Sequence, residues 1–562
     1  MRLPHRGVLF PTLLVAASVL AAYPARGATP VLEAMKQELQ RSVDTLSKQP
    51  TPLYFLSYEV TGNRRFSVRA SFGNVTGSSE GESAVVDVDL RVGSPELDNT
   101  HSIRGDSLAN YPRFAYQSAP LEDPEALRSI LWRRTDQQYK AAVERLAKVK
   151  ANVQIKVEEE DQAGDFSAEP AQKWLEEPLP LEYDRTPWEE KLGRYTAPFS
   201  SSGHIYRANA TLSANVETRW YVNSEGSEIR TSQSYYRLMI MAYTKAEDGM
   251  ELPRYESFFS FTAEGLPDDS QVLATVEEMI ADLEALRKAP AVDPYTGPAI
   301  LSGRASGVFF HEILGHRIEG HRQKREDEGQ TFKKMVNQKV LPETFSVIFD
   351  PTVRRRGDMD LVGAYRYDNE GVKSRRVPVI QKGVLKTFLL SRTPIEGFSR
   401  SNGHGRKQAG LPAVARQSNL FVEVTRSHSR EELKAMLIDS LKREDKPFGL
   451  YFKDVQGGFT FTGRTIPNMF NVLPVMVYRI YADGREELVR GVDLIGTPLT
   501  AFSKIAAADD HFESFNGICG AESGGVPVSA VSPAVLVSQI EVQKKEKSPE
   551  RLPILPPPWE SP

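Results

Sequence analysis

Residues 307–323, GVFFHEILGHRIEGHRQ, contain the side chains of this sequence that are best suited to chemistry. The segment holds three of the nine histidines of the chain, His311, His316 and His321, and Glu312 follows the first of them directly. Two imidazoles and an adjacent carboxylate are the usual parts of a hydrolytic zinc site. There the metal lowers the pKa of a bound water to about 7, and the carboxylate takes its proton. The segment therefore predicts a metal centre suited to hydrolysis.

The two histidines of such a site are normally four residues apart, as in H-E-x-x-H. That spacing turns the side chain by about 40° around a helix, so both rings face the metal, whereas a spacing of five residues corresponds to about 140°. The helix must therefore be interrupted between His311 and His316. Gly315 can end it, because glycine readily adopts a positive φ. We expect a helix over residues 306–314, with His316 in the turn just beyond it.

A catalytic zinc site normally has three protein ligands and one open position, so a third ligand is needed. One candidate is His321, although its spacing does not match the known three-histidine motif. The other is Cys519, the single cysteine of the chain, whose thiolate is a strong zinc donor and whose flanking glycines allow a close approach. In the absence of a metal, the histidines would be hydrogen-bonded residues at a helix end. Cys519 would then be buried and inert, or linked to another chain.

The elements that position these residues fall into two halves. In the first half, apolar residues recur every three or four positions, which predicts amphipathic helices over 30–48, 125–153 and 269–290. Segments rich in β-branched and aromatic residues, bounded by Gly-containing turns, predict antiparallel strands. These segments cover 52–62, 65–73, 83–93, 206–224 and 230–244. The polar, acid-rich segment 158–173 is expected to be an exposed connection.

The second half begins with a short apolar strand at 298–303, which leads into the histidine segment. Most of the chain beyond that segment resembles strands, with a tight hairpin at the Asp483-Gly484 pair and one helix over 430–443. The sequence thus predicts an α+β protein. An N-terminal α/β domain with an antiparallel sheet and helices (28–293) precedes a β-rich C-terminal domain (294–545) that carries the metal-site helix.

Length and composition are those of a globular protein with more than one domain: 562 residues, 40% hydrophobic and 26% charged. The net charge of −4, with both signs interspersed, argues against a nucleic-acid partner. Residues 1–27 combine early arginines, an apolar run and small residues at the end, which predicts a cleaved signal peptide and export to the periplasm or the medium. An uncleaved anchor is the alternative, and no later segment predicts a membrane span. Residues 546–562 are proline-rich and predict an extended tail.

Several segments of the second half resemble, in order, the TldD/PmbA family of metalloproteases. HEILGHRIEG (311–320) resembles the H-E-x-x-x-H signature of the active, TldD-like subunit of that family. CGAESGGVPVSAVSPAVLVSQIEV (519–542) resembles its C-terminal cysteine block. Further matches are DNEGVKSRRVPVIQKGVLKTFLLS (368–391), GHGR (403–406) and SNLFVE (418–423). The resemblance covers most of residues 296–545.

The resemblance implies that His311, His316 and Cys519 bind one zinc ion in each active subunit and that Glu312 is the general base. It implies a peptidase that cleaves unfolded or short extended peptides within a dimer, formed with a second copy or with a family paralogue. Iron or cobalt would fit the same ligands. With Cys519 as the third ligand, His321 becomes a residue that supports the ligands or is simply exposed.

Two other functions compete with this interpretation. The first is a catalytically silent assembly partner, against which the retention of the complete motif argues. The second is a secreted binding protein with a structural metal site. Glu312 argues against the second, because a structural site needs no carboxylate beside its first ligand and usually has four protein donors.

Several residues near the motifs have weaker assignments. Glu319 can either orient a histidine ligand or form a surface ion pair with Arg322 or Arg317. Four further side chains could stabilise a developing oxyanion: His404, Arg406, Tyr365 and Tyr367. The alternatives are a glycine-rich surface loop with solvated charges for the first two and ordinary core positions for the tyrosines.

Overall fold

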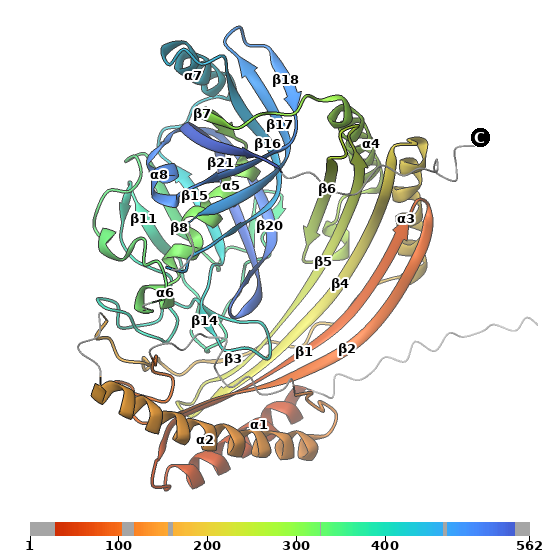
Figure 1. Cartoon of the computed structure of the whole chain (residues 1–562). Helices are drawn as coiled ribbons and strands as arrows, with labels where there is room; N and C mark the ends of the chain where they lie inside the picture. Colours follow the sequence, from red (N-terminus) through yellow and green to blue (C-terminus); the bar gives the residue numbers. More distant parts are fainter. Residues whose placement is uncertain (1–27, 104–116, 156–160, 326, 465–468, 546–562) are drawn as a thin grey trace, which may run out of the picture.

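The computed structural model describes residues 28–103, 117–155, 161–325, 327–464 and 469–545. The predicted leader (1–27) and the proline-rich tail (546–562) lie outside these residues. A long curved sheet with helices forms the N-terminal part, and a β-rich C-terminal part lies on the concave side of that sheet (Figure 1). The predicted α+β class is confirmed. None of the described helices has the length and apolar character that a membrane crossing requires.

The N-terminal part is built on a six-stranded sheet with the order β2-β1-β4-β5-β3 and with β6 paired to β5. Its strands are β1 (Leu53–Ser71), β2 (Asn74–Val92), β3 (Lys173–Leu175), β4 (Ile205–Asn223), β5 (Glu228–Lys245) and β6 (Glu251–Ser260). The expected strands 52–62 and 65–73 are one continuous strand, β1. Gly62 lies inside that strand rather than in a turn. Its lack of a side chain makes room for Trp220, because a Cβ at this position would come within 3.2 Å of the Trp220 ring.

Four helices cover one face of this sheet: α1 (Ala28–Leu46), α2 (Pro124–Ile155), α3 (Arg185–Thr196) and α4 (Asp269–Lys288). Side chains alternate between the two faces of a strand. In β1 the buried apolar residues Tyr58, Val60, Phe66 and Val68 point to the helices. α1 and α2 cover one end of that face, and α3 and α4 cover the other.

The opposite side of the sheet, called here the inner face, carries polar and aromatic side chains and borders the cavities next to the C-terminal part. It includes Asn63, Glu217, Tyr235, Arg237, Ser257 and Phe259. A sheet covered by helices on one side alone leaves its second side free for such residues. The inner face is therefore available to form one wall of a site.

The C-terminal part is an eleven-stranded, mostly antiparallel sheet. Its strands are β7 (Tyr295–Leu301), β8 (Phe345–Phe349), β11 (Val377–Gln381), β12 (Val384–Leu385), β15 (Asn419–Val424), β16 (Phe448–Thr460), β17 (Phe470–Tyr481), β18 (Glu486–Val489), β19 (Val492–Gly496), β20 (Ile505–Ala521) and β21 (Gly524–Lys544). β7 pairs with both β16 and β21, which closes β21, β19, β17, β16 and β7 into a ring. Two short ribbons, β9–β10 (Arg355–Arg356, Met359–Asp360) and β13–β14 (Gly405–Arg406, Val414–Ala415), lie outside this sheet.

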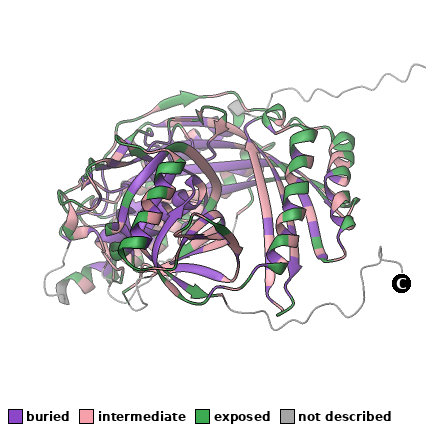
Figure 2. Ribbon diagram, turned by 90° about the horizontal axis from the view of Figure 1, so that it is seen from above, coloured by how far each residue is buried: buried purple, intermediate pink, exposed green. Residues whose placement is uncertain are grey.

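The helices of this part are α5 (Gly303–Ile313), α6 (His321–Lys324), α7 (Arg430–Arg443) and α8 (Pro498–Ser503). α5 follows β7 directly and packs against β16, β17, β20 and β21. Figure 2 shows that buried residues follow the strands, whereas the outward sides of the helices are exposed. The expected hairpin is confirmed: β17 pairs with β18 around Gly484, which has a φ of +87°.

The acid-rich segment 158–173 differs from the expectation of an exposed connection. Residues 161 and 165–167 are buried between the two parts, Phe166 among them, whereas most of residues 168–173 are exposed as expected. The guanidinium groups of Arg91 and Arg392 each lie 3.9 Å from the centre of the Phe166 ring. Arg392 also donates a hydrogen bond to the Ser167 carbonyl over 2.9 Å. These contacts join the N-terminal sheet to the C-terminal part.

Candidate metal centre

The histidine segment forms a helix that changes type at its end. The Ser302 hydroxyl caps α5 by accepting a hydrogen bond from the Ala305 amide, and the apolar residues of the helix pack into the C-terminal core. After Ile313 the chain passes through Leu314, with φ −114° and ψ −56°, into a 3-10 turn, η4 (Gly315–Ile318). The tighter turn changes the angular spacing of the side chains, which resolves the five-residue spacing of the histidines.

Gly315 has a different role from the one expected. It is not among the glycines with a positive φ, because the change from α5 to η4 occurs without a left-handed residue. The space around it explains the glycine instead. A Cβ at this position would lie 1.9 Å from the Gln417 Oε1 atom. Gly315 therefore allows the Gln417 side chain to pack directly against the turn.

Three side chains from distant segments converge beyond this turn. His311 comes from α5, His316 from η4 and Cys519 from β20, and their ligand atoms all lie within 4.8 Å of one another. The centres of the two imidazole rings are 5.0 Å apart, and the ring planes are nearly perpendicular. The Cys519 sulfur is 3.4 Å from the His316 Nε2 atom. The structure thus brings together the two histidines of the motif and the single cysteine.

A hairpin and a buried arginine hold Cys519 in place. Cys519 lies near the tip of the β20–β21 hairpin, directly opposite Val526. The guanidinium of Arg416 donates hydrogen bonds to the Cys519 carbonyl over 2.7 Å and to its sulfur over 3.2 Å. Arg416 is fully buried and forms an ion pair with Glu319 over 3.2 Å. The thiol therefore has a fixed position and a cationic neighbour.

Glu319 combines both of the roles considered for it, at a fully buried position rather than at the surface. Its Oε2 atom lies 3.4 Å from the His316 Nδ1 atom and 3.0 Å from the Arg322 Nε atom. Burial opposes ionisation, but His316 and Arg322 outweigh it and lower the pKa of Glu319 to about 2. A carboxylate on the far nitrogen of a histidine ligand fixes the orientation and tautomer of its ring.

Glu312 lies beside this cluster with one oxygen unused. Its side chain is buried, and among the described residues its Oε2 atom has no hydrogen-bond partner. Gly458 of β16 packs against it so closely that a Cβ there would lie 2.7 Å from the Glu312 Cγ atom. Burial raises the pKa of Glu312, with His311 and His316 opposing the shift. The carboxyl group is therefore well placed to accept a proton.

The electrostatics of the cluster favour an ionised cysteine. Burial opposes the thiolate, but His316 and His311 outweigh it and hold the pKa of Cys519 well below its ordinary value. Burial likewise opposes a charged His316, yet the Cys519 thiolate and Glu319 raise the pKa of His316 well above its ordinary value. A thiolate with two imidazoles is a donor set that zinc prefers. The residues present therefore fit a zinc ion, with Glu312 beside it.

The cluster opens into a cleft of about 720 Å³ between the two parts of the molecule. His311, Glu312 and His316 lie on one side, next to the strand edges of β20 and β16. The inner face of the N-terminal sheet supplies the other side with Arg237, Met239, Tyr255 and Ser257. Figure 1 shows β20 and the strands β5 and β6 on the two sides of this region.

The other candidate residues lie elsewhere. His321 is buried and contacts the Glu522 carboxylate, outside the cluster of three. His404 and Arg406 are also buried, so a solvated surface loop is wrong for them. Hydrogen bonds hold His404 to Ser418 and Asn402, and Arg406 donates to two backbone carbonyls. None of these side chains lines the cleft, and neither do Tyr365 and Tyr367.

Three supporting residues have no signal in the sequence spacing. Arg416 holds Cys519, Gln417 packs on Gly315, and Gly458 backs Glu312. Arg416 and Gln417 lie two to three residues before β15, so a search for polar residues near strand ends could have found them. Gly458 follows Gly457 within β16, and a glycine inside a strand indicates a bulge or a close approach of another group.

The C-terminal half also matches known proteins. Residues 294–544 match the family model of the PmbA/TldA metallopeptidase C-terminal domain. A metalloprotease of Methanocaldococcus jannaschii is 30% identical over 313 residues, which are 55% of this chain and 64% of that protein. A metalloprotease TldD homologue of Haemophilus influenzae is 27% identical over 282 residues, 49% of this chain and 54% of that protein. The chain thus spans less than two thirds of the length of these curated relatives.

Solved structures resemble almost the whole chain. TldE from Thermococcus kodakarensis has a TM-score of 0.57 at 13% identity, covering 91% of this chain and 100% of that one. A Thermotoga maritima protein, described as a candidate modulator of a DNA gyrase, has a TM-score of 0.59 at 16% identity and covers 90% and 99%. At these identities the likeness concerns the fold. The family model and the curated relatives agree, and residues 294–544 of this chain belong to the TldD/PmbA family.

Proposed function

We propose that this protein is a zinc-dependent peptidase that hydrolyses unfolded or short extended peptides. The observation that carries the proposal is the convergence of His311, His316 and Cys519 in one cleft. Beside them lies the Glu312 carboxylate, whose Oε2 atom has no hydrogen-bond partner among the described residues. A zinc ion bound by these donors supplies Lewis acidity and lowers the pKa of a bound water. The names of the curated relatives support the metallopeptidase class.

Glu312 is the general base in this proposal. Its Oε2 atom is buried and free to accept the proton of the attacking water, and burial raises the pKa of the carboxyl group toward the range in which bases work best at neutral pH. Arg317 donates a hydrogen bond to the Glu312 carbonyl over 2.6 Å, which holds the backbone of the base. The contact with Gly458 limits the side chain to one position.

The cleft suits an extended main chain. Over residues 514–521, within the described part of the chain, β20 pairs on one side only, with β21. These residues border the cleft, and Ile518 beside Cys519 is 61% exposed. An unpaired strand edge binds an extended peptide through its amides and carbonyls, with little dependence on side chains. We therefore expect unfolded peptides, rather than folded proteins, as substrates.

Location and assembly extend the proposal. The leader-like residues 1–27 support export to the periplasm or the medium. A dimer, formed with a second copy or with a family paralogue, is the assembly that the resemblance of the sequence motifs implies. Cell fractionation and light scattering of the purified protein test these two points separately.

The test of the function compares wild type with Glu312→Gln. We expect both to bind about one zinc per chain by mass spectrometry, and the variant to cleave unfolded peptides at least about 100-fold more slowly. His316→Gln should lose the metal, whereas His321→Gln, outside the cluster, should retain it. Unchanged cleavage by Glu312→Gln would show that Glu312 is not the general base. Metal binding without cleavage by wild type would favour a structural site or a silent partner.

A further inference from the structure

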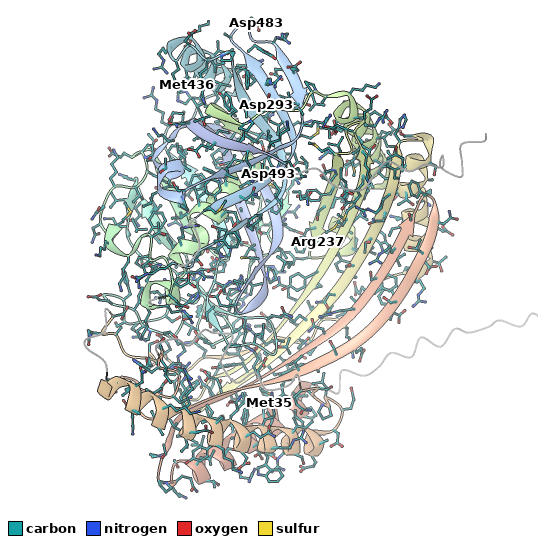
Figure 3. All side chains as sticks on the ribbon, in the orientation of Figure 1. Met35, Arg237, Asp293, Met436, Asp483 and Asp493 are labelled. Atoms are coloured by element: carbon teal, nitrogen blue, oxygen red, sulfur yellow. The ribbon has the colours of Figure 1, made fainter. Side chains whose placement is uncertain are left out.

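The inner face of the N-terminal sheet forms the wall of the cleft across from the metal ligands. Along β5 the residues Tyr236, Leu238 and Ile240 are buried beneath the helices, so the alternating residues Arg237 and Met239 point into the cleft. On β6, Ser257 pairs with Met239, and Phe259 pairs with Arg237. Arg237 and Ser257 are therefore diagonal neighbours on one face, within reach of a common ligand. Figure 3 shows Arg237 on the side of the sheet toward the C-terminal part.

Arg237 differs from the other arginines of the cleft in having no acidic partner. Arg304 forms ion pairs with Asp454 and Glu256, over 3.1 and 3.5 Å. Arg322 contacts three carboxylates. The Arg237 guanidinium lies 5.9 Å from the centre of the Phe259 ring and interacts with Tyr255, and no carboxylate of the described residues pairs with it. A partly buried guanidinium without an anion is costly and therefore unusual in a wall made only for packing.

Ser257 repeats this pattern. Its hydroxyl is buried and, in the described part of the chain, has no hydrogen-bond partner. Buried hydroxyl groups normally do have one. Burial lowers the pKa of Arg237, and a guanidinium remains a cation in proteins. Two adjacent donors thus point into the same space without an acceptor.

The position of Arg237 gives these donors a function in substrate binding. Arg237 borders both the cleft of the metal ligands and an adjoining cavity of about 730 Å³, and Ile518 of β20 does the same. Arg237 therefore lies where the two cavities share a wall. It is placed to contact a peptide that extends from the metal ligands into the second cavity.

We propose that Arg237 and Ser257 form a subsite for a carboxylate of the peptide substrate. Guanidinium and carboxylate groups match in charge and geometry, and the serine hydroxyl donates a further hydrogen bond. The carboxylate comes from an acidic side chain or from the C-terminus of the peptide. The inference rests on the proposed peptidase function and adds to it a preference for anionic peptides.

The experiment uses the full-length, zinc-loaded protein and two pairs of matched fluorogenic peptides. One pair differs by Glu against Gln, and the other by a free C-terminus against an amide. We expect kcat/KM of wild type to be about tenfold or more higher for the carboxylate member of one pair, which identifies the source. Arg237→Gln should abolish that preference, lowering kcat/KM for the carboxylate peptides to the value for their neutral counterparts. Ser257→Ala should reduce the preference partly.

Controls separate this inference from effects on folding. Arg207→Gln alters an arginine of the same sheet that is paired with Glu251, and it should preserve the preference. Arg237→Lys keeps a cation at this position and should retain part of the preference for carboxylate peptides. An equal loss for neutral and anionic peptides in Arg237→Gln would overturn the inference, and so would a wild type without any preference.

A binding arm distinguishes failure of the subsite from failure of the proposed chemistry. Fluorescence anisotropy measures binding of the same peptides to Glu312→Gln, which does not require cleavage. The subsite is supported if Glu312→Gln binds the carboxylate peptides selectively and if adding Arg237→Gln to this variant abolishes that selectivity. This holds even where wild type cleaves none of the peptides. Binding without selectivity overturns the subsite, whatever the activity.

Discussion

The Arg416 guanidinium donates hydrogen bonds to both the sulfur and the carbonyl oxygen of Cys519, over 3.2 and 2.7 Å, from a fully buried position. The same side chain pairs with Glu319, which in turn contacts His316. One arginine thus connects two of the three candidate ligands. Such supporting groups typically contribute a factor of about 10 to 100 to metal affinity.

We therefore expect Arg416→Lys to weaken zinc binding by about 10- to 100-fold, because an ammonium group cannot contact Cys519 and Glu319 in the same geometry. Competition with a chelator of known affinity measures the change. Arg392→Lys is the matched control, since Arg392 is equally buried but pairs with Glu225 away from the cluster. Equal losses of affinity in both variants would mean that only general stability is affected.

Gly458→Ala should displace the general base. The new Cβ would lie 2.7 Å from the Glu312 Cγ atom, so the carboxylate must move. Small displacements of catalytic groups lower rates by as much as about 100-fold. We expect kcat to fall by about 10- to 100-fold while zinc content stays at the wild-type value. Gly81→Ala, at a strand position with open space, should change neither quantity, and a large loss of zinc in Gly458→Ala would contradict this explanation.

Local patterns were sufficient to predict several features of this molecule. The helix with His311 and the hairpin at Gly484 depend on residues close in the sequence, and both occur in the structure. Apolar periodicity and β-branched segments likewise indicated most helices and strands, and hence the α+β class. Cys519 was recognised as a candidate ligand by its residue type and by the resemblance, but local patterns do not show packing between distant segments. Gly315 is explained by Gln417 rather than by its own φ, and Phe166 is buried because two remote arginines enclose its ring.

The explanation for Gly315 is testable by a double-mutant cycle. Gly315→Ala would place a Cβ 1.9 Å from the Gln417 Oε1 atom, so we expect reduced stability and loss of zinc. Truncating the neighbour in Gly315→Ala/Gln417→Ala removes the clash and should restore most of the zinc content of Gln417→Ala alone. The zinc stoichiometry and the thermal midpoint are measured for wild type, the two single variants and the double variant. A double variant as poor as Gly315→Ala would point to a backbone requirement instead.

His404 should make stability dependent on pH. Burial lowers its pKa to about 3, against about 6.5 for an unperturbed histidine. Between these values the unfolded chain binds a proton at His404 that the folded chain does not bind. The contribution of neutral His404 to the free energy of unfolding is therefore complete above about pH 6.5 and falls with decreasing pH. One such proton contributes about 1.4 kcal/mol per pH unit. Urea denaturation from about pH 7.5 to about pH 5 measures the free energy of unfolding.

Substitution of His404 tests whether this residue causes the pH dependence of the free energy of unfolding. His404→Gln should lower stability at every pH, because it disturbs the hydrogen bonds to Asn402 and Ser418, but it should flatten the dependence below about pH 6.5 by about one proton. His204→Gln, at an exposed turn, should leave the slope as in wild type. Identical slopes in wild type and His404→Gln would show that other groups cause the dependence.

Cys519 lies 203 residues beyond His316 in the chain and arrives on the β20–β21 hairpin. A nascent chain that has not yet reached residue 519 therefore contains two imidazoles and the neighbouring carboxylate, but lacks the thiolate that completes the donor set. In an unfolded full-length chain the thiolate is present but is not held beside the imidazoles. On the proposed function, hydrolytic capacity appears only once this late hairpin has docked against α5. Incomplete copies of the protein are then unable to digest one another, although each is itself an unfolded peptide of the kind that the finished protein cleaves.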